Sequence, residues 1–125
     1  MTHDSNSPAC RTINHLLQRI GDKWSVLVVM TLSEGSRRFS ELRRQIPSIS
    51  QRMLTLTLRN LERDGLVSRT VTASIPPRVD YELTELGHSL KGPIGALSQW
   101  ALANIETIHA AQDRFDRVHD AATAA

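Results

Sequence analysis

The residues whose types and spacing are most suggestive of chemistry lie between Ser48 and Asp64, in the segment SISQRMLTLTLRNLERD. In a DNA major groove, arginine pairs well with guanine edges and glutamine with adenine edges. If the segment is a helix, one side carries such groups, and no carboxylate appears in it before Glu62. The candidate DNA contacts on this side are Ser48, Ser50, Gln51, Arg52, Thr55 and Arg59.

The other side of the same segment is apolar. Met53, Leu54, Leu58 and Leu61 recur at helical spacing, which predicts a helix with one face packed inward. An ordinary amphipathic helix with a solvated polar side has the same pattern. The pattern of this segment alone therefore does not distinguish a helix that contacts DNA bases from an ordinary amphipathic helix, and the neighbouring segments are needed for that distinction.

The charge distribution favours a nucleic-acid surface. The chain of 125 residues has a net charge of +2, which alone indicates little about partners. Residues 36–70, however, hold eight arginines and three acidic residues, a net charge of +5, so the remainder carries −3. A basic middle in a slightly acidic chain is typical of a protein that neutralises DNA phosphates. Arg38 in this stretch is a further candidate contact.

Three helices are predicted before this segment. Apolar spacing predicts a first helix from Thr12 to about Gly21, and a second, mostly buried helix from a cap at Asp22 to Leu32. After a turn, residues 37–39 suggest a short strand. Ser40 could then cap a short helix that Pro47 stops, because the residue before proline avoids helical geometry. Two short helices joined by a tight turn are the helix-turn-helix arrangement, with Ser48 or Ser50 capping the second.

A two-stranded wing is predicted after this segment. Gly65 ends the helix as a C-cap, and residues 66–72 and 79–83 alternate as strands do. The prolines between them exclude a strand interior and mark the tip of a hairpin. Arg78 lies at the edge of this tip, where it could reach DNA backbone or a minor groove, or could simply be a solvated turn residue.

The C-terminal part predicts a dimerisation helix capped by Thr84 and kinked near Gly92 and Pro93. Its apolar stripe is longer than a core of this size can cover, and the same helix of a second subunit is the simplest cover. The candidate dimerisation residues are Leu90, Ile94, Leu97, Trp100, Ala101 and Ile105. Such a dimer would hold two DNA-reading helices about one helical turn apart, ~34 Å, on a two-fold symmetric site.

Other classes of protein fit less well. The chain has no apolar run near the ~20 residues of a membrane span, and a single cysteine fits a reducing cytoplasm. Its five histidines show no metal-ligand spacing, and no glycine-rich phosphate loop is present, so we expect no enzyme activity, metal or cofactor. A winged helix that binds protein would be expected to lack the basic face.

Three blocks of sequence carry a resemblance to a known family: IGDKW from Ile20, RRFSELRRQIPSISQRMLTLTLRNLERDGLVSR from Arg37, and PPRVDYELTELG from Pro76. In this order and spacing they resemble the HxlR-type winged helix-turn-helix transcription regulators. The resemblance implies a mainly α fold with a small β-wing and a homodimer formed through N- and C-terminal helices. It also implies a regulator, by default a repressor, that binds a palindromic operator in double-stranded DNA.

By position, the resemblance makes Ser50–Asp64 the recognition helix and Val67–Leu83 the wing. We therefore expect an N-terminal disordered arm at residues 1–9, a DNA-binding domain at 10–90, and a C-terminal dimerisation helix and tail at 91–125.

Cys10 matches a feature of one branch of this family, in which an N-terminal cysteine senses electrophiles or oxidants. That cysteine is usually followed by proline, whereas Arg11 follows Cys10 here. A thiol at a helix start beside an arginine can react with oxidants to give a sulfenic acid or a disulfide. The alternative is an unreactive cysteine packed under the dimer interface.

Overall fold

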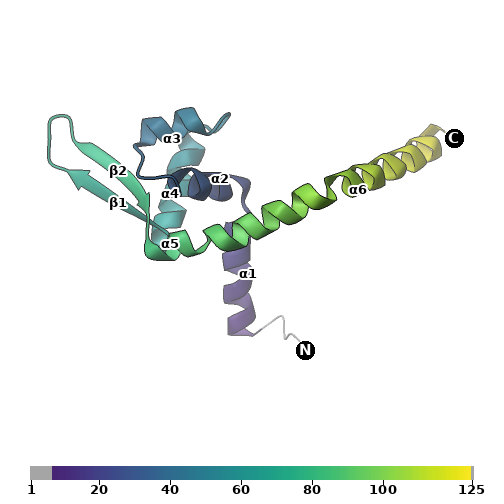
Figure 1. The fold of residues 1–125 in the computed structure, drawn as a ribbon, viewed down its shortest axis with the longest axis horizontal. Helices are drawn as coiled ribbons and strands as arrows, with labels where there is room; N and C mark the ends of the chain where they lie inside the picture. Colours follow the sequence, from purple (N-terminus) through teal and green to yellow (C-terminus); the bar gives the residue numbers. More distant parts are fainter. Residues whose placement is uncertain (1–6, 125) are drawn as a thin grey trace. The chain divides into compact units, whose positions relative to one another are not determined.

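The computed structural model describes residues 7–124, with side chains to residue 120, and divides into two compact units between Lys91 and Gly92 (Figure 1). Described separately, the first unit contains seven elements and the second is one long helix. The elements are α1 (Pro8–Gly21), α2 (Lys23–Leu32), α3 (Phe39–Gln45), α4 (Gln51–Arg63), β1 (Val67–Thr72), β2 (Arg78–Leu83), α5 (Glu85–Ser89) and α6 (Lys91–Ala124). The predicted fold class, mainly helical with a two-stranded wing, is confirmed.

The first helix begins earlier than the apolar pattern predicts, at Pro8 and not at Thr12. The Ser7 hydroxyl accepts a hydrogen bond from the Cys10 backbone N–H at 3.1 Å, and proline is well suited to the first helical position. Of the predicted N-terminal arm, Pro8 and Ala9 are therefore helical and Ser7 is the N-cap, while residues 1–6 lie outside the described residues.

The helix-turn-helix consists of α3, a five-residue turn and α4. The predicted cap at Ser40 is wrong, because α3 begins at Phe39, and the carboxylate of Glu41 accepts a hydrogen bond from the Arg38 backbone N–H at 3.0 Å. Ser48 in the turn has a φ of 68°, an uncommon left-handed conformation for a non-glycine residue. Ser50 is the N-cap of α4 and accepts from the Met53 backbone N–H at 3.0 Å.

The C-terminus of α4 is capped at Gly65, as the sequence predicts. Gly65 has a φ of 77°, its N–H bonds to the Glu62 carbonyl at 3.1 Å, and the Leu66 N–H bonds to the Leu61 carbonyl at 2.9 Å. This pair of bonds is the Schellman arrangement, which satisfies the last helical carbonyls. The wing follows directly, so the geometry of this turn sets how β1 leaves α4.

The wing is an antiparallel pair in which Val67 faces Leu83 at the base and Thr72 faces Arg78 near the tip. Arg37 adds a single bridge on the outer edge of β2, with backbone bonds of 2.8 and 2.9 Å to Tyr81. The predicted strand at residues 37–39 is therefore reduced to one residue, because Phe39 already belongs to α3.

The core of the first unit lies where α2, α3, α4 and the base of the wing meet. Its fully or nearly buried side chains include Val28, Val29, Leu32, Leu42, Ile46, Leu54, Leu58, Leu61, Val67 and Leu83. Gly87 of α5 packs against the wing so closely that a Cβ there would clash with the Leu66 carbonyl oxygen. Thr84 fastens the same corner, since its hydroxyl caps the Gly87 N–H at 3.0 Å and donates to the Gly65 carbonyl at 2.6 Å.

The prediction of one C-terminal helix kinked at Gly92 and Pro93 is wrong. The helix is interrupted at Leu90, between α5 and α6, and Pro93 lies in the first turn of α6. Proline has no N–H for the carbonyl four residues earlier, here that of Ser89, and its ring crowds that carbonyl. In a first turn this N–H is not needed, so α6 then continues for 34 residues. None of the helices in the described part of the chain is long and apolar enough to cross a membrane.

Candidate nucleic-acid interface

Three adjoining hollows run along the exposed side of the helix-turn-helix. One lies between α3 and the start of α4 and is lined by Phe39, Ser40, Arg43, Arg44 and Gln51. The next, of about 570 Å³, follows α4 and is lined by Gln51, Arg52, Thr55, Leu56 and Arg59. The third, of about 390 Å³, lies between α4 and the wing and is lined by Thr55, Leu58, Arg59, Glu62, Arg69 and Tyr81. Since neighbouring hollows share residues, they form one continuous surface, which we call the basic surface.

The polar side of α4 is exposed, as the helical spacing predicts. Gln51, Arg52, Thr55 and Arg59 are exposed, and all four line the hollow along α4. On the opposite side Leu54, Leu58 and Leu61 are each at most 2% exposed. The predicted amphipathic helix is therefore confirmed, and its polar face belongs to the basic surface.

The hydroxyl groups among the candidate residues also have structural roles. Ser50 accepts from the Met53 N–H as the N-cap, and Thr55 donates to the Gln51 carbonyl at 2.9 Å. Ser48 is exposed in the turn and lines none of the three hollows. Gln51 and Arg52, at the N-terminal end of α4, are therefore the candidates with the most freedom to meet a base edge.

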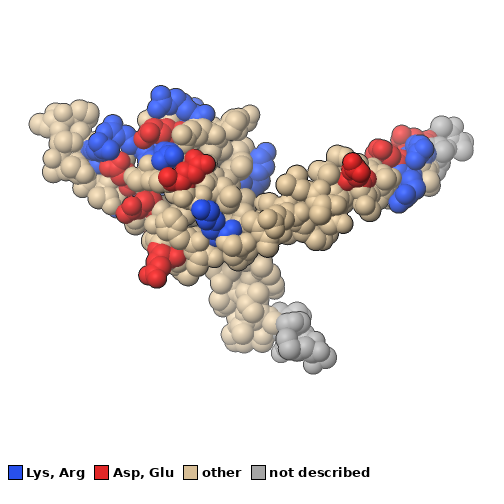
Figure 2. Space-filling model, in the orientation of Figure 1, with Lys and Arg blue, Asp and Glu red and all other residues tan. Residues whose placement is uncertain are grey.

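The arginines fall into two groups according to their partners. Arg19, Arg37 and Arg78 have carboxylate partners: Asp64 at 2.7 Å, Glu34 at 3.7 Å and Asp80 at 3.0 Å, respectively. Among the described residues, no carboxylate lies within ion-pair distance of the arginines of the basic surface. These are Arg43, Arg44, Arg52, Arg59 and Arg69. Figure 2 shows Lys and Arg side chains over α3 and the wing, with Asp and Glu side chains among them.

Two of the predicted contacts outside α4 lie apart from these hollows. Arg38 is exposed just before α3, and Arg78 is exposed near the wing tip with its guanidinium on Asp80. Sequence reasoning missed Arg69 and Tyr81, which face each other across β1 and β2. A signal was available for Arg69, because it shares a strand face with Val67, whose side chain is buried.

The proposed sensing and dimerisation residues lie at the two ends of the chain. Cys10 is partly buried in the first turn of α1. In and before α6, Leu90 and Ala101 are partly exposed and Ile94 is 4% exposed, whereas Leu97, Trp100 and Ile105 are 65%, 58% and 43% exposed. Within the described residues, no group of three or more His, Cys, Asp or Glu side chains is placed to hold a metal.

Comparisons with known proteins agree with this geometry. A family model described as HxlR-like helix-turn-helix matches residues 19–109. An HTH-type transcriptional regulator of Methanothermobacter thermautotrophicus is 52% identical over 84 residues, which are 67% of this chain and 64% of that protein. The regulator YtcD of Bacillus subtilis is 41% identical over 98 residues, 78% of each chain.

Among solved structures, the reduced form of the redox regulator HypR superposes with a TM-score of 0.73 at 40% identity, covering 79% of this chain and 98% of that one. The family is one of transcription regulators and not of enzymes. The fold, the matched residues and the relatives together show that this chain belongs to the HxlR-like family of helix-turn-helix transcription regulators.

Proposed function

We propose that this regulator binds a two-fold symmetric operator as a homodimer, with α4 in the major groove. The observation that carries the proposal is the basic surface, on which five arginines surround the exposed face of α4 without a carboxylate partner among the described residues. Arginines in this state neutralise phosphates and release counterions, which supplies salt-dependent affinity. Gln51 and Arg52 on the same face supply side chains that can distinguish bases.

The test compares specific with non-specific binding after a single substitution. A footprint on the upstream intergenic DNA identifies the bound sequence, and Arg52→Ala is then titrated against that duplex and a scrambled duplex. We expect affinity for the specific duplex to fall by about 1–3 kcal/mol, with little change for the scrambled one. Equal losses on both duplexes would make Arg52 a phosphate contact. Failure of the unmodified protein to bind any duplex would overturn the proposal itself.

The homodimer is supported by the apolar side chains exposed on α6. Leu97, Trp100 and Ile105 follow helical spacing in a stretch, Gly92–Ile105, that contains no charged residue. Exposed apolar patches of this kind are typical of interaction surfaces, and a second copy presents the same stripe. We propose that this regulator acts as a repressor, because a bound dimer that occupies promoter DNA is sufficient to block transcription. It would act in the cytoplasm, where the DNA is.

A redox switch at Cys10 is the second part of the proposal, supported by the likeness to HypR and by the position of the thiol. Cys10 is only partly buried, so an oxidant can reach its thiol. Moreover, α1, which carries it, is joined to the C-cap of α4 by the Arg19–Asp64 ion pair. A modification that shifts α1 could therefore reach α4. Oxidation by diamide would join two Cys10 thiols as a disulfide, with both hydrogens passing to diamide.

The corresponding experiment uses Cys10→Ser. We expect this variant to bind DNA as the unmodified protein does and to lose any change of DNA affinity caused by diamide. If diamide changes the affinity of both proteins equally, Cys10 has only a packing role.

A further inference from the structure

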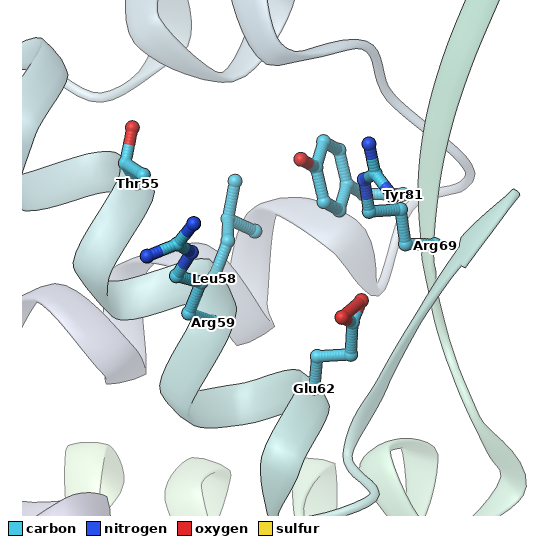
Figure 3. Close-up of a pocket in the computed structure, with 6 residues that line it drawn as sticks. All are labelled: Thr55, Leu58, Arg59, Glu62, Arg69 and Tyr81. Carbon is cyan, nitrogen blue, oxygen red and sulfur yellow. The ribbon is translucent and has the colours of Figure 1, made fainter. Parts of the chain in front are cut away.

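The third hollow of the basic surface, between α4 and the wing, has the composition of an oxyanion site. Figure 3 shows Thr55, Leu58, Arg59 and Glu62 on α4, facing Arg69 and Tyr81 of the wing across the pocket of about 390 Å³. The Tyr81 hydroxyl points from β2 toward α4, and Arg69 lies beside the Tyr81 ring (Figure 3). Donors thus enter the pocket from a helix and from a sheet.

The donors in this pocket suit a phosphate group. Arg59 and Arg69 have no carboxylate within ion-pair distance among the described residues, in contrast to Arg78 at the start of β2, which is paired with Asp80. Guanidinium groups bind phosphate oxygens in a charge-assisted and often bidentate way, and tyrosine hydroxyls are frequent additional donors to DNA phosphates. The lining contains one opposing charge, the carboxylate of Glu62.

The position of the pocket indicates where on the DNA such a phosphate would lie. If α4 lies in the major groove and the wing reaches the adjacent minor groove, the backbone that separates the two grooves passes between α4 and the wing. Thr55 and Arg59 line both this pocket and the hollow along α4, so the two are continuous. We infer that the pocket seats one phosphodiester of the DNA backbone, an inference that rests on the proposed function. Arg69 and Tyr81 hold this phosphate from the wing and Arg59 holds it from α4.

This assignment changes the role expected of Arg59 and also assigns a role to Glu62. Arg59 becomes a phosphate contact that fixes the protein's register on DNA and does not read bases. Glu62 repels the phosphate and keeps non-specific affinity low. Removing the Glu62 charge should therefore strengthen binding to every duplex, which is the opposite of the effect of removing Arg69.

The experiment measures how affinity depends on salt. Fluorescence anisotropy with a labelled 24-base-pair duplex of mixed sequence is recorded from 50 to 300 mM NaCl. Arg69→Ala should reduce the slope of log affinity against log salt by about 0.9, which corresponds to about an eightfold loss at 0.1 M salt. Arg69→Lys should keep the slope, because it keeps the charge. Glu62→Gln should raise affinity at every salt concentration.

Arg114→Ala is the matched control, because it removes one exposed arginine of α6 that lies outside the basic surface. We expect its salt slope to equal that of the unmodified protein. Circular dichroism melting of each variant shows that the fold is kept, which Arg69 permits because its side chain is exposed. An unchanged slope for Arg69→Ala overturns the phosphate seat alone, whereas an unmodified protein that binds no duplex overturns the proposed function and the seat together.

A free anion is the other possible source of a phosphate group in this pocket. Calorimetric titration with inorganic phosphate, at constant ionic strength, separates the two sources. We expect no saturable binding below millimolar concentrations. Saturable micromolar binding that Arg69→Ala abolishes, together with an unchanged DNA salt slope, would identify a small-anion site and overturn the assignment to the DNA backbone.

Discussion

The helices α4 and α6 are both amphipathic, but they expose opposite kinds of surface. In α4 the leucines at positions 54, 58 and 61 are at most 2% exposed, and the exposed face is basic and polar. In α6 large apolar side chains are exposed, among them Leu97 at 65% and Trp100 at 58%. Between Lys91, its first residue, and Glu106, α6 has no charged residue. An exposed basic face is typical of DNA binding, and an exposed apolar face is typical of protein–protein contact. In the proposed function, α4 therefore binds DNA and α6 forms the dimer.

A pair of leucine substitutions gives the largest expected contrast. Leu58→Ala should lower the free energy of unfolding by about 2–5 kcal/mol, because it removes a buried side chain and leaves a cavity. Leu102→Ala should lower it by no more than about 0.5 kcal/mol, because that side chain is exposed. Urea denaturation monitored by circular dichroism measures both. A comparable loss for Leu102→Ala would mean that this face of α6 is also covered.

Substitution of the α6 stripe tests the proposal that a second copy covers it. Trp100→Ala should weaken self-association by about 2 kcal/mol, roughly thirtyfold, because buried tryptophans dominate interfaces. Sedimentation at several protein concentrations measures the monomer–dimer equilibrium. Gln99→Ala, next to it on the same helix but outside the proposed set, is the control and should leave the equilibrium unchanged. A protein that is monomeric before any substitution contradicts the proposed dimer.

The smallest expected difference is between two ion pairs. Arg19 and Asp64, whose side chains are 28% and 19% exposed, join α1 to the end of α4, whereas Arg78 and Asp80 lie within one strand. Arg19→Gln should cost about 1 kcal/mol of unfolding free energy, since it leaves a partly buried carboxylate without its partner. Arg78→Gln should cost less than about 0.5 kcal/mol, because that arginine is more exposed. Thermal unfolding at low and high salt distinguishes them, and equal costs would show that the α1–α4 pair does not anchor α4.

Much of the fold was predictable because its determinants are local. Ser50 as a cap, Gly65 as a stop and the alternation of the wing strands each depend on a few neighbouring residues. The errors were also local in origin. The apolar pattern placed the start of α1 at Thr12, but Ser7 and Pro8 supply a cap without any apolar periodicity. In the C-terminal part, Pro93 has no N–H for the Ser89 carbonyl, so the helix is interrupted at Leu90 and not at Pro93 itself.

By itself, then, the sequence determined the family, the helix that faces outward and the basic character of its surroundings, since spacing and charge are properties of the chain. Only the tertiary structure decided which arginines remain without carboxylate partners. Arg78 looked accessible in the sequence but meets Asp80, while Arg69 is placed opposite Tyr81 and beside α4. The Arg78–Asp80 pair forms because β2 places residues two apart on the same face of the strand. The shared pocket depends on strand register and on the packing of the wing against α4, which bring together residues distant in the chain.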